Sequence, residues 1–205
     1  MTQQNSFSVL PAVISALDDI QSSGHHQEEC TWIAGSGKAE LYVRDRLGAT
    51  LAKKHPEVIV AREWGKNKHD LAILNSEAQP LAVLEGKHLF DFDLFVPSYR
   101  EKYRKSILKD RKKLVASGAN EQLVSLLMTS FVGNVPAHLK KVSKYSVGSN
   151  KYFKKHGSEA MPLAVKEADH FLREFGNVVH ERKLSSGQFY GFEVCVWMWL
   201  VDTTR

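Results

Sequence analysis

Three charged side chains lie beside two short apolar segments in the first half of the chain. Asp70 precedes the segment 71–74, and Glu85 and Lys87 follow the segment 80–84. Side chains of an extended strand alternate between its two faces, so Glu85 and Lys87 project to the same side, and a hairpin would place Asp70 beside them. Charges at the ends of buried strands cost desolvation free energy unless they pair or bind something. Two carboxylates and an ammonium group therefore form the candidate active site.

A helix is expected just before these segments. Apolar residues recur every four positions from Ala39 to Leu51, and His55-Pro56 ends the pattern, which predicts a helix over residues 38–54. Glu40 lies near the first turn of this helix. Its carboxylate either stabilises the helix N-terminus or contributes a third acid to the site.

The neighbouring segments predict an α/β fold with a central mixed sheet flanked by helices. Apolar segments at 58–64, 69–74 and 80–88 are separated by short polar turns, which is typical of an antiparallel meander. A helix over 99–117 and an apolar segment over 122–132 follow. A strand, a crossover helix and a second strand indicate that the segment 122–132 pairs in parallel within the same sheet.

The rest of the chain is expected to surround this core. The pattern predicts a peripheral helix over 1–20, a loop over 21–37, an irregular basic region over 133–157, a helix over 162–175 and a closing strand over 190–201. No internal repeat is evident. We therefore expect one domain over residues 1–205, with residues 133–160 as a candidate basic insertion within it.

Composition places few limits on function. The 205 residues are 43% apolar and 25% charged, as in an ordinary globular protein, and the net charge of +5 permits a polyanionic partner. Cys30 and Cys195 fit neither a disulfide framework nor a zinc spacing, which predicts a cytoplasmic protein. No segment approaches the ~20 apolar residues of a membrane span, so no membrane partner is expected.

The predicted elements and their charged residues resemble the PD-(D/E)XK nuclease superfamily, which has the restriction-endonuclease-like fold. The resemblance covers about residues 38–132. The strand aspartate of the family falls on Asp70, its Glu-x-Lys pair falls on Glu85 and Lys87, and Glu40 stands where many members carry an extra helix acid.

The chain departs from the family pattern at two positions. His69 precedes the aspartate where the family often has proline, and Gly86 replaces the usual apolar residue between the glutamate and the lysine. Gly86 would leave a small gap in the core or kink its strand, without removing a functional group.

The resemblance implies a metal-dependent DNA endonuclease that hydrolyses phosphodiester bonds in restriction, repair or defence. Oxygen ligands from Asp70, Glu85 and the Gly86 carbonyl suit Mg²⁺, with Mn²⁺ as a substitute. Lys87 would orient the attacking water, take its proton if its pKa is lowered, or stabilise charge on the phosphate. The alternatives are an exposed Glu85–Lys87 ion pair without function, and a non-catalytic nucleic-acid-binding or partner-binding protein that keeps the fold.

DNA is the expected partner, double-stranded rather than single-stranded DNA or RNA, because basic side chains supply phosphate contacts. If both strands are cut, a two-fold homodimer is expected. Each basic segment could instead be a solvated helix face or a mobile loop. The candidate contacts are Arg100, Arg104, Lys105, Arg111 and Lys112 in the helix 99–117, and Lys140, Lys141 and Lys144 in the basic region.

Three further residues have open roles. His69 and His88 flank the acids and could contact phosphate or be incidental. Glu63, at the end of the strand 58–64, could be another acid of the metal site or the partner of a nearby basic side chain.

Overall fold

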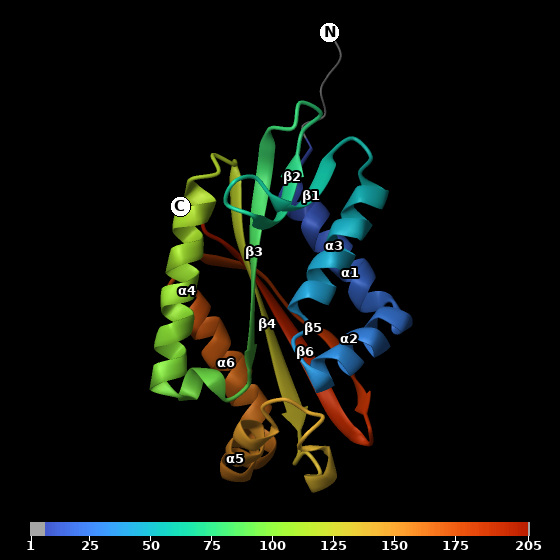
Figure 1. Cartoon of the computed structure of the whole chain (residues 1–205), viewed down its shortest axis with the longest axis vertical. Coiled ribbons are helices and arrows are strands. Elements are labelled where there is room, and N and C mark those ends of the chain that lie inside the picture. Colours follow the sequence, from blue (N-terminus) through green and yellow to red (C-terminus); the bar gives the residue numbers. More distant parts are fainter. Residues whose placement is uncertain (1–6, 205) are drawn as a thin grey trace.

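The chain forms an α/β structure around a six-stranded mixed sheet, seen in a computed structural model that describes residues 7–204 (Figure 1). The strands are β1 (Ile59–Trp64), β2 (His69–Leu74), β3 (Pro80–Phe90), β4 (Glu121–Val132), β5 (Asn177–Phe189) and β6 (Phe192–Asp202). The helices are α1 (Val9–Ser22), α2 (Gly24–Ser36), α3 (Glu40–Lys54), α4 (Pro97–Val115), α5 (Ser146–His156) and α6 (Ala160–Leu172), with short 3₁₀ turns η1 (Asp93–Phe95), η2 (Ala137–Leu139) and η3 (Gly157–Glu159).

The sheet has the order β1-β2-β3-β4-β6-β5 and is open at both edges. The first three strands form the predicted antiparallel meander, and α4 crosses over so that β4 pairs in parallel with β3, from Ala82 opposite Glu121 to Phe90 opposite Thr129. The sequence-based expectation of an α/β fold with a meander plus a parallel strand is therefore confirmed. β6 pairs antiparallel with both β4 and β5.

β3 extends well beyond its partner β2. The paired residues of the two strands run from Leu74 opposite Pro80 to Leu71 opposite Leu84, whereas β3 continues along β4 as far as Phe90. From Glu85 onward, the edge of β3 that faces β2 is therefore free of strand pairing. The candidate residues Glu85, Gly86 and Lys87 lie where β2 and β3 separate.

Helices cover both faces of the sheet (Figure 1). α1, α2 and α3 pack on one face, and α4 and α6 pack on the other. α3 buries Val43, Leu47 and Leu51 at the predicted spacing, because an apolar stripe every three to four residues faces the sheet. α4 buries only a narrow stripe that includes Ile107 and Leu114, and its other residues are mostly basic.

The prediction of a loop over residues 21–37 is wrong, because α2 occupies most of this segment. Its buried face consists of Cys30, Thr31, Ala34 and Gly35, which are small and carry little hydrophobic signal. A Cβ atom on Gly35 would lie 2.4 Å from the ring of Phe189, so the small side chains serve a close approach between α2 and β5. A helix that packs through small residues has no strong apolar periodicity in its sequence.

Two further elements were missed. β5 is an edge strand whose sequence is mostly polar, since one of its faces is largely exposed. α5 lies within the region predicted to be irregular, where it buries Ser146, Ser149 and Tyr152 rather than an aliphatic stripe. The other predicted elements are present with ends shifted by a few residues, and residues 1–6 of the predicted N-terminal helix lie outside the described residues.

Both cysteines, Cys30 and Cys195, are free and buried. Within residues 7–204, the helices are too short or too polar to span a lipid bilayer.

Candidate functional site

Gly86 lies beside the carboxylates of both Asp70 and Glu40. The backbone N–H of Gly86 donates a hydrogen bond of 2.7 Å to Oδ2 of Asp70. A Cβ atom on Gly86 would lie 3.2 Å from Oε1 of Glu40 and 3.5 Å from Oδ2 of Asp70. A side chain at position 86 would therefore press on Glu40, whereas its contact with Asp70 would be an ordinary one.

The two acids come from different elements that the fold brings to this edge. Asp70 is the second residue of β2, and Glu40 begins α3. Burial and the nearby charge of Asp70 raise the pKa of Glu40, while Lys87, Lys38 and Arg44 act in the opposite direction. Two nearby carboxylates in a partly buried position favour an additional positive charge close to both.

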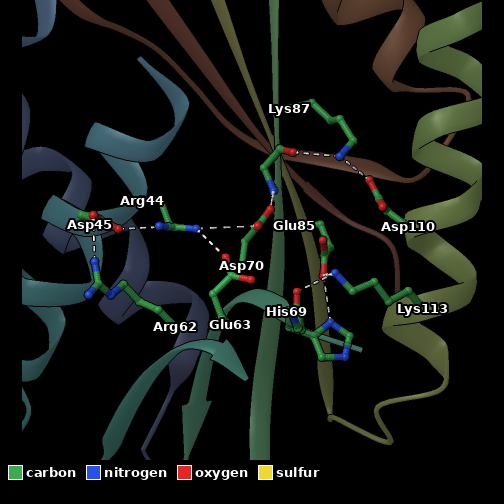
Figure 2. Close-up of polar contacts among 12 residues, drawn as sticks. Arg44, Asp45, Arg62, Glu63, His69, Asp70, Glu85, Lys87, Asp110 and Lys113 are labelled. Atoms are coloured by element: carbon green, nitrogen blue, oxygen red, sulfur yellow. Dashed lines mark hydrogen bonds and ion pairs between the residues drawn. The ribbon is translucent and has the colours of Figure 1, made fainter. Parts of the chain in front are cut away.

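Arg44, one turn beyond Glu40 on α3, borders this pair of acids. Its guanidinium lies 2.9 Å from Glu63, 2.9 Å from Asp45 and 3.9 Å from Oδ1 of Asp70 (Figure 2). Of the two roles open for Glu63, the structure places its carboxylate in an ion pair with a basic side chain.

Lys87 bonds both to α4 and to the backbone of β3. Its Nζ atom lies 2.5 Å from Oδ2 of Asp110 on α4 and donates a hydrogen bond of 3.0 Å to the Gly86 carbonyl. Burial lowers the pKa of Lys87, but the hydrogen bond and charge of Asp110, together with Glu40 and Asp70, raise it overall above the ordinary value. Lys87 is therefore a cation at neutral pH, which favours its electrostatic roles over proton acceptance.

Glu85 lies on the other side of β3 from Asp70 (Figure 2). Its Oε1 atom lies 2.6 Å from Nζ of Lys113 on α4 and 2.8 Å from Nδ1 of His69, and the side chain is 3% exposed. Burial raises the pKa of Glu85 to about 7, against the lowering effect of Lys113. The structure thus brings together Glu40, Asp70 and Gly86, and separately holds Glu85 between Lys113 and His69.

The oxygen atoms around Gly86 fit a small divalent cation. Mg²⁺ commonly binds through one or two carboxylates, with water and substrate phosphate completing its coordination. Asp70, Glu40 and the Gly86 carbonyl supply such a donor set. Among residues 7–204, no three His, Cys, Asp or Glu side chains are arranged as a complete metal site, so a cation here would depend on carbonyl, water or phosphate oxygens as well.

The two histidines near the acids are both internal. His69 is 1% exposed, and burial followed by the charge of Lys113 lowers its pKa, so that it is neutral and can donate to Glu85. His88 is also 1% exposed, with Nε2 2.9 Å from Oγ1 of Thr129, and burial lowers its pKa to about 3. In this arrangement neither imidazole reaches the surface, where a phosphate would bind.

The basic side chains of α4 divide into two groups. Arg100 and Arg104 point to α6 and the turn that follows it. Arg100 pairs with Glu167 on α6 and with Glu174 in the turn, and Arg104 lies 2.5 Å from Glu174. These ion pairs join α4 to α6 and to the turn after it, and they engage two arginines that were expected to contact phosphate. Lys105 is largely exposed beside Glu101, Lys112 is exposed, and Arg111 is half-buried.

The basic residues beyond β4 remain at the surface. Lys140, Lys141 and Lys144 are all exposed, and in the part of the chain that the structure describes none of them forms an ion pair. They lie between η2 and α5, where Tyr145 and Val142 are also exposed. This surface stays a candidate for nucleic-acid contacts.

Sequence reasoning missed Lys113, Asp110 and Arg44, which surround the acids. Asp110 is the sole acid between residues 102 and 120, in an otherwise basic helix, and it is 9% exposed. Lys113 follows it by three residues and therefore lies on the same face of α4. Arg44 follows Glu40 by four residues, which places it on the same face of α3. These spacings were the sequence signals from which the three residues could have been predicted.

Comparison with known proteins gives no relative: no family model, curated protein or solved structure matches the chain. The functional conclusion therefore depends on the residues and geometry described above.

Proposed function

We propose that the protein is a metal-dependent nuclease with a restriction-endonuclease-like core, which hydrolyses phosphodiester bonds in DNA. The observation that carries this proposal is that the Asp70 and Glu40 carboxylates both lie beside Gly86, with the Lys87 ammonium group bonded to the Gly86 carbonyl. The order of an acid-bearing helix, a three-stranded meander, a crossover helix and a parallel strand supports it.

Asp70, Glu40 and the Gly86 carbonyl would hold Mg²⁺ or Mn²⁺, which when bound lowers the pKa of water and offsets phosphate charge. Glu85 is the remaining predicted ligand. To bind the cation, it would have to give up its contact with Lys113 or with His69. Lys87 stays protonated and donates to negative charge that develops on the phosphate. Asp110 positions the Lys87 ammonium group at the free edge of β3.

A second candidate is a non-catalytic nucleic-acid-binding or partner-binding protein. The observation that favours it is that Glu85 and Lys87 already have internal partners, namely Lys113, His69 and Asp110. In this alternative, these pairs stabilise the fold and take no part in catalysis. This alternative requires DNA binding that is sensitive to salt, needs no metal and survives the loss of Asp70.

Cleavage of DNA by purified protein tests the proposal. With Mg²⁺ or Mn²⁺, we expect cleavage of plasmid or oligonucleotide DNA, and with EDTA we expect none, because the proposed hydrolysis needs the cation. Gel analysis of supercoiled, linear and single-stranded DNA, with RNA in parallel, measures the products. If folded protein binds DNA but cleaves no nucleic acid with either cation, the non-catalytic alternative is correct.

Gly86→Val should reduce cleavage by up to about 10²-fold, because displacement of catalytic groups by ~1 Å has effects of this size. Its branched side chain suits a strand, but its Cβ atom would lie 3.2 Å from both Cγ and Oε1 of Glu40. The rate of cleavage at saturating metal measures the effect. Gly24→Ala is a matched control, because a Cβ atom on Gly24 meets nothing within 4 Å. An unchanged cleavage rate in Gly86→Val would show that the closeness of Glu40 and Asp70 to Gly86 is not needed for catalysis.

A further inference from the structure

A second hollow lies along β3 from the candidate active site. It has a volume of about 170 Å³ and is lined by Lys38, Phe90, Asp93, Tyr99, Lys102, Tyr103 and Tyr145. Phe90 lies four residues beyond Gly86, on the same face of β3, at a distance of about 13 Å. Lys38 is two residues before Glu40. The hollow and the site therefore both lie along β3. Figure 1 shows α4 and the segment before α5 near the C-terminal end of this strand.

The floor and walls of the hollow are aromatic. Phe90 is 2% exposed and its ring centroid lies 4.6 Å from that of Tyr145, which is 52% exposed. Tyr99 on α4 is 46% exposed. Tyr145 has a φ angle of 62°, a left-handed conformation that residues other than glycine rarely adopt. The chain adopts this conformation at the residue whose ring packs on Phe90.

The charged groups of the hollow favour a base rather than a phosphate at its floor. Asp93 is buried there, and its Oδ2 atom accepts hydrogen bonds from the Phe90 N–H at 2.9 Å and from the Tyr103 hydroxyl at 2.8 Å. A buried carboxylate opposes a bound phosphate. Lys38 and Lys102 are exposed, and within the described residues neither belongs to an ion pair. They can contact phosphates of the same strand outside the aromatic floor.

We infer that this hollow binds one unpaired nucleotide, with its base against the exposed rings of Tyr145 and Tyr99 and its phosphates near Lys38 and Lys102. Its volume is smaller than the ~300–1,000 Å³ of drug-sized pockets, so it suits a single ring system. Aromatic rings provide stacking surfaces for unpaired bases. A continuous duplex has no unpaired base to place on them.

The inference rests on the proposed nuclease function and narrows its substrate. The distance from Gly86 to Phe90 along β3 corresponds to about four stacked nucleotides at ~3.4 Å each. An unpaired nucleotide would therefore lie within a few positions of the cleaved bond. The substrate is then DNA with a single-stranded end, flap or gap, rather than an uninterrupted duplex.

Binding in EDTA tests this inference independently of cleavage. Fluorescence anisotropy would compare a blunt duplex with the same duplex carrying a single-stranded overhang on one strand. We expect the overhang duplex to bind about tenfold or more tightly than the blunt duplex. Tyr145→Ala should remove this preference, since loss of a stacking ring typically lowers affinity by about 5- to 150-fold. Tyr145→Phe should retain it.

Tyr190→Ala is the matched control. Tyr190 is also exposed, has a positive φ angle of 46° and packs on a phenylalanine, but it lies in the β5–β6 turn outside the hollow. Its loss should leave the preference unchanged. Equal affinity for the two duplexes, or a preference that survives in folded Tyr145→Ala, would overturn the inference. Preferential binding of the overhang duplex without cleavage in Mg²⁺ supports the nucleotide subsite and rejects the nuclease proposal. Cleavage in Mg²⁺ without preferential binding supports the nuclease proposal and rejects the subsite.

Discussion

Asp70→Asn should reduce metal-dependent DNA cleavage by at least about 10²-fold while leaving the fold intact. The Asn side-chain carbonyl can still accept the 2.7 Å hydrogen bond from the Gly86 N–H, so the edge of β3 keeps its contact. The negative charge is lost, however, and charge is what a carboxylate supplies to a divalent cation. Removal of one electrostatic group from an active site typically lowers kcat by 10²–10³-fold. Initial rates of oligonucleotide cleavage measure the loss.

Asp19→Asn provides the control for this substitution. Asp19 is a half-exposed acid on α1 whose partner is Lys54, outside the candidate site. Circular dichroism and the unfolding midpoint should match the unmodified protein for both variants. Full cleavage activity in folded Asp70→Asn protein would remove Asp70 from the active site, and with it the central contact of the proposal.

Lys113→Met should lower the free energy of unfolding by about 3 kcal/mol at pH 8. Lys113 lies 2.6 Å from Glu85, whose side chain is 3% exposed, and removal of one partner leaves a buried carboxylate with His69 alone. Loss of one member of a buried ion pair costs about 3–5 kcal/mol. Because the Lys113 side chain is 23% exposed, we expect the lower end of that range. Urea unfolding in EDTA, followed by tryptophan fluorescence, measures the change.

The pH dependence has a definite sign. The pKa of Glu85 is raised to about 7 in the folded protein, mainly by burial, from an ordinary value of 4.5. The folded state therefore binds more protons than the unfolded state between these values, and this group makes stability fall as pH rises from about 4.5 to 7. Without Lys113 the folded pKa rises further, so the decrease should extend to higher pH in Lys113→Met.

A second substitution isolates the Glu85–Lys113 pair. Glu85→Gln removes the buried charge, so the double variant Glu85→Gln/Lys113→Met should recover most of the lost stability. Lys112→Met is the matched control, because Lys112 is an adjacent exposed lysine on α4. Equal destabilisation by Lys112→Met and Lys113→Met, or no recovery in the double variant, would contradict the pairing.

The elements with strong periodicity could be predicted from the sequence. α3 and the strands of the meander follow from apolar spacing and polar turns, and the parallel pairing of β4 follows from the length of the crossover through α4. α2 and β5 could not be predicted in this way. α2 buries small residues such as Gly35 and Ala34, and β5 is a polar edge strand, so neither carries a hydrophobic pattern that marks its buried side.

The spacing of Glu85 and Lys87 by itself determined that both side chains lie on the same face of β3, because side chains alternate along a strand. Only the tertiary structure decided how these groups are partnered. α3 brings Glu40 to Asp70 across Gly86, while α4 supplies Lys113 to Glu85 and Asp110 to Lys87. Such contacts depend on how separate helices pack against the two faces of one strand, and sequence spacing within a single element carries no record of that packing.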